Sequence, residues 1–312
     1  MSFGIGEFYS LACALAWAIA VILFKKSGES LPPVALNLFK NVVGLLLMAV
    51  TVLAFTGTAL PELPAAVVAL ALFSGFLGIG AGDTLYFRAL NAIGASRMGI
   101  AQTLYSPFVI VLSSLFLAER LGLWQLLGVA LVLAGITLVN YAAPSASAGD
   151  KNSSSRTPAS RGVLVDARAI RRGVINAAAS VFLMALGVVI AKPLLERYDF
   201  LWIVSLRIVG GTLGLLLLVA LRGETAKVWN SFRSVRHWPQ VIAGSIVGTY
   251  ISMLLWLAGY KYTSASVASV LNEMAAVFIL ILAAIFLHDR LKRAQLAGAA
   301  LAVSGVLLVV VR

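Results

Sequence analysis

Long apolar runs constrain the fold of this chain more than any other feature of its sequence. A helix needs about 20 apolar residues to cross the roughly 30 Å hydrocarbon core of a bilayer. Ten runs qualify: residues 5–24, 33–55, 65–87, 95–117, 122–141, 172–191, 200–221, 239–259, 264–287 and 294–311. Only 12% of the 312 residues are charged, about half the fraction of a typical soluble domain. The sequence therefore predicts an all-α integral membrane protein with ten transmembrane helices.

The distribution of charge excludes one class of partner and predicts an orientation. A net charge of +12 can indicate nucleic-acid binding, but here Lys and Arg lie in short loops between apolar runs, where they meet lipid headgroups and set topology. Loops on the side of the N-terminus carry five of them, and loops on the other side carry seventeen. Because the positive side faces the cytoplasm, we expect both termini outside the cytoplasm of a bacterial inner membrane, and no nucleic-acid partner.

Reactive residues give no sign of catalysis. Cys13 is the only cysteine, which excludes an intramolecular disulfide and a cysteine-based zinc site. His237 and His288 lie in or beside loops without a partner at metal-ligand spacing. No nucleophile-elbow, zinc-protease or phosphate-loop motif occurs. We expect no enzyme activity, no cofactor and no metal. The first run precedes the first lysine, Lys25, so it is expected to be a retained span.

The two halves of the chain resemble each other, which indicates an internal repeat. A shift of 170 residues places Gln102 on Asn272, Tyr86 on Trp256, Glu119-Arg120-Leu121 on Asp289-Arg290-Leu291, and Gly128 and Gly135 on Gly298 and Gly305. The first two runs match at a shift of 167, which places Lys40 on Arg207. Five spans are an odd number, so the second repeat must be inverted, as in many transporters. The predicted division is 1–142, a polar linker over 143–171, and 172–312.

Four charged residues lie well inside the predicted spans: Lys40, Asp83, Arg207 and Glu273. Such a charge costs about 2.5–3.5 kcal/mol on insertion scales, so these residues should pair or face a wet cavity. Their depths predict a contact of Lys40 with Asp83 toward the side opposite the N-terminus, and of Arg207 with Glu273 toward the N-terminal side. The pairs could gate a pathway or hold helices in register. Alternatively, the two cations could bind an anionic substrate.

Other polar and aromatic residues accompany these charges inside the spans. Asn37, Lys40 and Asn41 follow helical spacing and share one helix face. The remaining candidates for a cavity lining are Trp17, Tyr86, Gln102, Tyr105, Trp256 and Asn272. Pro107 interrupts the fourth span and predicts a kink, or a hinge beside a cavity. Glycines in the third and seventh spans predict close helix approach.

Several motifs resemble those of a known family. The first span carries Ala16-Trp17-Ala18, followed by Lys25. The ends of the fourth and ninth spans carry two equivalent motifs, Phe116-Leu117-Ala118-Glu119-Arg120-Leu121 and Phe286-Leu287-His288-Asp289-Arg290-Leu291. They resemble EamA domains of the drug/metabolite transporter superfamily, over nearly the whole chain apart from the linker. The resemblance implies a central cavity, alternating access and export of metabolites such as amino acids. The family's Glu-Pro early in the ninth helix is absent, so no role is carried over to Glu273.

Three functions remain open from the sequence. The first is a secondary-active transporter of amino acids or related organic solutes, acting as an exporter, with protons as a candidate coupling ion through Asp83 or Glu273. The second is a translocase for lipids or lipid-linked substrates. The third is a non-transporting membrane sensor or assembly component. The expected partners of the protein are a small-molecule substrate and the lipid bilayer. A wet cavity lined by Lys40, Tyr105, Arg207 and Glu273 would argue against the third function.

Overall fold

The computed structural model describes residues 4–26, 32–56, 62–142, 167–235, 237–286 and 292–310. Within these ranges all regular elements are helical, and ten stretches are long and apolar enough to cross a membrane. They are Ile5–Leu23, Val34–Thr56, Ala65–Tyr86, Met98–Phe116, Leu123–Tyr141, Arg171–Arg197, Phe200–Leu221, Trp238–Tyr262, Ala265–Phe286 and Arg293–Val310. All ten predicted spans are confirmed, with ends displaced by a few residues.

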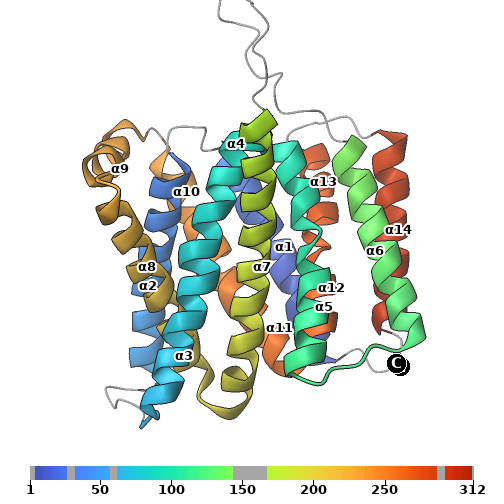
Figure 1. The fold of residues 1–312 in the computed structure, drawn as a ribbon, viewed down its shortest axis with the longest axis horizontal. Coiled ribbons are helices and arrows are strands. Elements are labelled where there is room, and N and C mark those ends of the chain that lie inside the picture. The colour runs from blue at the N-terminus through green and yellow to red at the C-terminus, as the bar shows by residue number, and fades with distance from the viewer. Residues whose placement is uncertain are drawn as a thin grey trace, which may run out of the picture.

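The helices stand side by side with their long axes roughly aligned (Figure 1). Six spans are single helices: α1 (Ile5–Lys26), α2 (Pro33–Thr56), α6 (Leu123–Ala142), α7 (Ala167–Arg197), α8 (Phe200–Leu221) and α14 (Arg293–Val310). Because α7 begins at Ala167, the last residues of the predicted linker are helical, and the rest of the linker lies outside the described residues. The short helix α9 (Thr225–Ser231) and the 3-10 turn η3 (Phe232–Ser234) lead from the seventh span to the eighth.

The other four spans are interrupted helices, and the two repeats interrupt them at equivalent positions. The third and fourth spans consist of α3 (Ala65–Gly75), the π-helical segment η1 (Phe76–Gly82), α4 (Asp83–Gln102) and α5 (Tyr105–Phe116). The eighth and ninth spans consist of α10 (Trp238–Ser245), the π-helical segment η4 (Ile246–Ile251), α11 (Ser252–Tyr262), α12 (Ala265–Asn272) and α13 (Ala275–Phe286). The shift of 170 residues carries η1 onto η4 and the gap between α4 and α5 onto that between α12 and α13. The fold is therefore two five-helix repeats.

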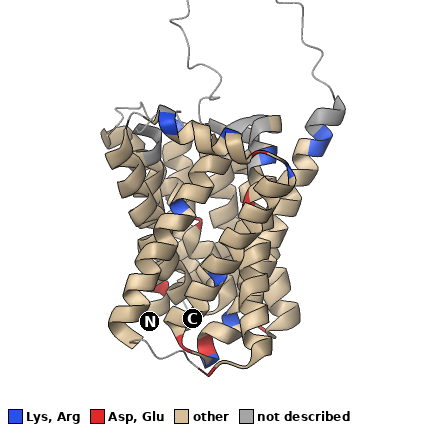
Figure 2. Cartoon of the chain, turned by 90° about the vertical axis from the view of Figure 1, so that its left-hand side faces the viewer, with Lys and Arg blue, Asp and Glu red and all other residues tan. Residues whose placement is uncertain are grey.

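The ends of the chain show how the repeats are placed in the bundle. The marked N- and C-termini lie at the same end, which we call the terminal end (Figure 2). An even number of spans requires this, and five spans in each repeat invert the second relative to the first. One predicted loop is helical instead, because α4 continues through residues 88–94 between the third and fourth spans.

Glycines join the last helix of one repeat to the last helix of the other. The helices α6 and α14 lie side by side (Figure 1). A Cβ atom at Gly128 would lie 2.6 Å from the carbonyl oxygen of Gly305, and one at Gly135 would meet the carbonyl oxygen of Gly298. The repeat shift exchanges these two pairs. The glycines that the sequence comparison aligned therefore allow two backbones to touch across the repeat interface.

Glycines also bring α8 against α3 and η1. A Cβ atom at Gly75 would collide with the carbonyl oxygen of Arg207, and one at Gly210 would collide with that of Leu72. A Cβ atom at Gly211 would meet the side chain of Ile79. The close approach predicted for the third and seventh spans is confirmed. It places Arg207 where α8 contacts α3, and its side chain is fully buried.

Candidate functional site

The two broken helices meet inside the bundle. At each break the backbone N–H groups bond to carbonyl oxygens three residues back, from Thr103 and Leu104 in one repeat and from Glu273 and Met274 in the other. Just beyond the first break, Ser106 donates its hydroxyl hydrogen to a carboxylate oxygen of Glu273 at 3.0 Å. One hydrogen bond therefore joins the repeat-related breaks.

Local sequence explains each break. Pro107 lies in the first turn of α5, has no N–H to donate to the carbonyl of Thr103, and would clash with that carbonyl in a continuous helix. The structure shows a break in the helix just before Pro107, and a hinge beside a cavity stays a prediction. In the second repeat, the amide nitrogen of Asn272 donates to the carbonyl oxygen of Ala268 at 2.8 Å, and such a side-chain bond competes with the helical backbone pattern.

Lys40 and Asp83 form the predicted contact. The Nζ atom of Lys40 lies 3.6 Å from Oδ2 of Asp83, and the two side chains are 16% and 18% exposed. Lys40 comes from α2, and Asp83 is the first residue of α4, directly after the π-helical segment η1. The pair is thus mostly buried but retains some access to solvent, unlike a fully enclosed ion pair.

The polar face of α2 points into the bundle as its spacing predicted. Asn37 and Asn41 are buried, and the amide nitrogen of Asn41 lies 3.5 Å from the amide oxygen of Asn37. One turn further along the helix, a Cβ atom at Gly44 would lie 2.8 Å from the side chain of Thr249 in η4. This face of the first repeat therefore packs against the π-helical segment of the second.

The predicted contact between Arg207 and Glu273 is wrong. Arg207 donates from Nη1 to the hydroxyl oxygen of Ser74 at 2.6 Å and to the carbonyl oxygen of Gly187 at 2.8 Å. Glu273 instead accepts from Ser106. The cause is the tight glycine packing of α8, which directs the Arg207 side chain toward α3 and α7 and away from the ninth span.

Aromatic side chains fill the space around Arg207. Its Cζ atom lies over the Trp256 ring, 5.8 Å from the ring centroid, and Trp256 packs edge-on against Tyr260. The hydroxyl of Tyr260 shares a hydrogen bond of 2.8 Å with that of Tyr105. Tyr105 is close enough to both Arg207 and Glu273 to interact electrostatically with each. Tyr105 therefore connects the two charged groups that do not touch.

The remaining predicted residues differ in their placement. Tyr86 is partly buried and packs against the main core. Gln102 and Asn272 lie at the ends of α4 and α12, beside the two breaks. Trp17 is 39% exposed and makes no hydrogen bond, ion pair or ring contact with another described residue. The predicted set is therefore divided: Gln102, Tyr105 and Asn272 adjoin the breaks, whereas Lys40 lies at Asp83, at the other end of α4.

Several buried polar atoms of this set have no hydrogen-bond partner among the described residues. They are Nδ2 of Asn37, Oδ1 of Asn41, Oε1 of Gln102, Nε and Nη2 of Arg207, and Oδ1 of Asn272, together with Oγ1 of Thr249 and Oε1 of Gln240. An unpaired buried polar atom costs about 1–3 kcal/mol. Such atoms occur in both repeats, and water or a polar solute could satisfy them.

A polar network that the sequence did not reveal joins α7, α1 and the end of α11 near the terminal end of the bundle. Lys192 of α7 is buried and donates to the carbonyl oxygens of Tyr260 and Thr263, both at 2.8 Å, and to the carboxylate of Glu196 at 2.7 Å. The Thr263 hydroxyl in turn donates to Glu7 of α1 at 2.9 Å. Lys192 directly follows the sixth predicted span, 172–191, where a charge usually faces water, so the sequence alone did not indicate these buried contacts.

Glu119 of the family motif caps a helix of the other repeat. Its carboxylate accepts from the backbone N–H groups of Ala265 and Ser266 at 2.7 and 3.0 Å, and from the Ser266 hydroxyl at 2.8 Å. These N–H groups are at the start of α12, where a helix has unpaired donors and favours negative charge. The motif therefore has a structural role, which the repeat alignment alone did not show.

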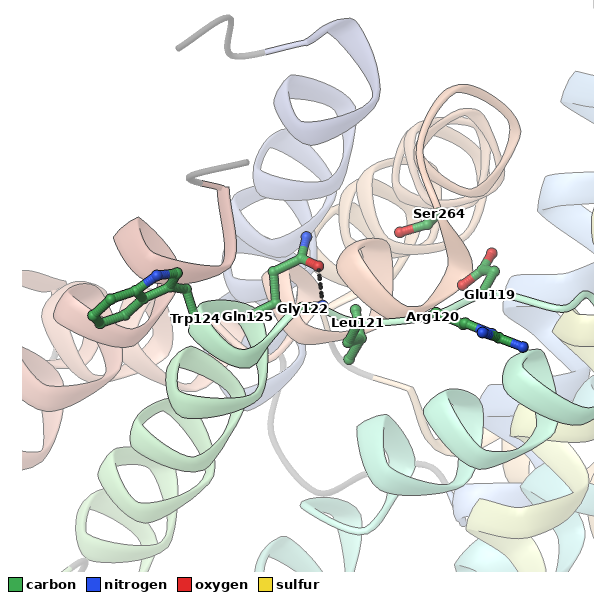
Figure 3. Close-up of a pocket in the computed structure, with 7 residues that line it drawn as sticks. All are labelled: Glu119, Arg120, Leu121, Gly122, Trp124, Gln125 and Ser264. Atoms are coloured by element: carbon green, nitrogen blue, oxygen red, sulfur yellow. Dashed lines mark hydrogen bonds between the residues drawn. The ribbon is translucent and has the colours of Figure 1, made fainter.

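A surface pocket of about 480 Å³ lies beside this cap (Figure 3). It is lined by Glu119, Arg120, Leu121, Gly122, Trp124, Gln125 and Ser264. The Gln125 side chain accepts from the backbone N–H of Gly122 at 3.0 Å, which fixes the turn into α6. None of these residues belongs to the charged and aromatic cluster around the breaks, so this pocket is separate from the predicted site.

Comparison with known proteins agrees with the geometry. The family model described as "EamA-like transporter family" matches residues 4–141 and again 171–311. An "Uncharacterized transporter" of Archaeoglobus fulgidus is 37% identical over 71 residues, which are 23% of this chain and 26% of that protein. "Uncharacterized transporter YvbV" of Bacillus subtilis is 31% identical over 139 residues, 44% and 45% of the two chains. The matches thus span less than half the length of either relative.

A solved crystal structure shares the fold. It superposes with a TM-score of 0.76 at 21% sequence identity and covers 97% of this chain and 95% of its own. This likeness shows the fold, and the double match of the family model agrees with two repeats. The ten apolar helices make this a multi-pass membrane protein, and the chain belongs to the EamA-like transporter family of the drug/metabolite transporter superfamily.

Proposed function

We propose that this transporter is a secondary-active exporter of small organic metabolites that works by alternating access. One observation carries the proposal. The broken helices of the two inverted repeats meet at the Ser106–Glu273 hydrogen bond, and the adjoining Gln102 and Asn272 each carry a buried oxygen with no partner among the described residues. Discontinuous helices at the interface of inverted repeats are where transporters of this architecture bind substrate. A packed sensor or assembly component would gain nothing from leaving these atoms unpaired.

Two sets of contacts are suited to close the pathway alternately. At the terminal end, Lys192 and Glu119 tie helices of different repeats or spans together. Nearer the opposite end, Lys40 and Asp83 join α2 to α4. Polar contacts of this kind can be exchanged for water when the helices separate, which apolar packing cannot do. One set opening while the other stays closed is the simplest cycle that these contacts support.

Glu273 is the proposed coupling group. Its carboxyl accepts from the Ser106 hydroxyl and has no Lys or Arg partner within ion-pair distance among the described residues. A carboxyl without a cation can take up and release a proton as the pathway opens to each side. Asp83, in contrast, is held by Lys40. The excess of Lys and Arg on the side opposite the termini supports a cytoplasmic location for that side of a bacterial inner membrane.

Counterflow in proteoliposomes tests the proposal. Vesicles with the purified protein are loaded with amino acids or organic acids and amines, and exchange of labelled solute is measured with and without a pH gradient. Flux of at least one solute should exceed that of protein-free vesicles. Glu273→Gln should abolish the response to the gradient, while the exposed control Glu62→Gln should not. No flux of any solute, together with movement of labelled lipid between leaflets, would favour the lipid translocase instead.

A further inference from the structure

We infer that the substrate carries a carboxylate group, and that the free edge of the Arg207 guanidinium binds it. The inference rests on the proposed function and adds the chemical class of the substrate. Its starting point is that Arg207 is the largest fully buried side chain in the described structure. It has no Asp or Glu within ion-pair distance among the described residues. A buried cation without an anion is costly unless some other group supplies the negative charge.

The hydrogen bonds of Arg207 leave one specific edge free. Nη1 uses its two hydrogens on Ser74 and Gly187, and this fixes the plane of the guanidinium. Nε and Nη2 have no hydrogen-bond partner in the part of the chain that the structure describes. These two nitrogens share the other edge of the group and present two parallel N–H bonds. That fork matches the two oxygens of a carboxylate, with charge-assisted hydrogen bonds to each.

The internal repeat shows which group is missing. In the first repeat, Lys40 is paired with Asp83, the first residue after the π-helical segment η1. The equivalent of Lys40 is Arg207, and the equivalent of Asp83 is Met253, just after η4. Both repeats thus keep a cation, but only one keeps its carboxylate. A substrate carboxylate would take the place at Arg207 that Asp83 takes at Lys40.

The surroundings favour a singly charged, partly apolar molecule. Trp256, one turn beyond Met253 on α11, lies over the guanidinium, and the paired hydroxyls of Tyr105 and Tyr260 lie nearby. Two other buried or mostly buried cations in the spans have anionic partners, Lys40 with Asp83 and Lys192 with Glu196. One free positive charge neutralises a monocarboxylate and leaves a doubly charged phosphate ester unbalanced. Because Arg207 is buried here, a displacement of α11 that moves Trp256 would expose the fork.

Three probes that share a phenyl ring and differ in their polar group test which group the site binds. Benzoate, benzamide and phenyl phosphate are titrated against the purified full-length protein, and the melting temperature is recorded. A ligand of the folded state raises stability with concentration. We expect benzoate to give a rising shift, phenyl phosphate a smaller one and benzamide none. Arg207→Lys keeps the charge but loses the fork, so the apparent Kd for benzoate should rise at least tenfold. The exposed control Arg233→Lys should match the unmodified protein.

A second pair of variants keeps the inference testable if Arg207→Lys folds poorly. Met253→Asp supplies an internal carboxylate at the repeat-equivalent position, whereas Met253→Asn supplies only a polar group. Met253→Asp should melt higher than Met253→Asn and should no longer respond to benzoate. A benzoate shift that persists in Met253→Asp and in Arg207→Lys would overturn the inference, as would equal shifts from benzoate and benzamide.

Transport data separate this inference from the proposed function. If the vesicles exchange only solutes without a carboxylate and benzoate gives no thermal shift, the Arg207 site is refuted and the exporter stands. If benzoate binding depends on Arg207 but no solute crosses the vesicle membrane, the site stands and the exporter is refuted.

Discussion

The ion pair of Lys40 and Asp83 allows a quantitative test of how charge is accommodated inside this bundle. At a separation of 3.6 Å, two unit charges attract by about 4–5 kcal/mol at an effective dielectric constant of about 20. Losing one partner leaves the other charge largely buried, and such losses are about 3–5 kcal/mol for buried pairs. Because both side chains keep 16–18% exposure, we expect Lys40→Met alone, or Asp83→Leu alone, to destabilise the protein by about 3 kcal/mol.

The double variant is the informative one. Without either charge, the site is apolar. The double variant, Lys40→Met with Asp83→Leu, should therefore lose less free energy of unfolding than the two single variants together, and the difference should be about 2–3 kcal/mol. Reversible unfolding in mixed detergent micelles measures each free energy of unfolding. Strict additivity would refute the reasoning, because it would mean that the two charges do not interact. Transport by the stable double variant then separates a gate from structural support: a leak or loss of transport indicates a gate.

Three further predictions concern packing, capping and orientation. Gly135→Val should prevent the approach of α6 to the carbonyl of Gly298 and lower the yield of folded protein. Gly99→Ala should be tolerated, because its Cβ would have ordinary contacts at 3.6 Å. Size-exclusion profiles compare the two variants. Glu119→Ala should lower stability by about 1–3 kcal/mol by leaving the N–H groups at the start of α12 unpaired, and Glu119→Gln should lose less; equal losses would contradict the capping role. In a Cys13→Ala background, Glu62→Cys should react with an impermeant maleimide in intact cells, and Thr225→Cys should react only after permeabilisation; the reverse pattern would invert the proposed orientation.

The sequence predicted the features that depend on position along the membrane normal. Spans follow from apolar length, and repeats follow from aligned charges and glycines. The contact of Lys40 with Asp83 follows from their similar depth in neighbouring spans. Depth alone does not say which way a side chain points around its helix, and for that reason the predicted contact of Arg207 with Glu273 is wrong. Gly75 and Gly210 allow α8 to pack closely against α3, and this packing determines the direction of the Arg207 side chain.

The sequence pattern did not predict the local backbone features of the interrupted helices. The π-helical segments η1 and η4 have no pattern that hydropathy can detect, and the break before Tyr105 was signalled only by Pro107. The second break has no proline at the equivalent position, which is Val277. Glu119 and Lys192 lie at the ends of spans, where charges usually face water. Their partners are backbone groups of distant helices, and only the assembled fold brings these together.

Accessibility at the two breaks tests alternating access most directly. Gln102→Cys and Asn272→Cys, each as the only cysteine in a Cys13→Ala background, are exposed to an impermeant thiol reagent in right-side-out and inside-out vesicles. Alternating access predicts that each position is labelled from both sides, and that a transported solute changes both rates in opposite directions. Labelling from neither side, with or without solute, would contradict a pathway through the breaks.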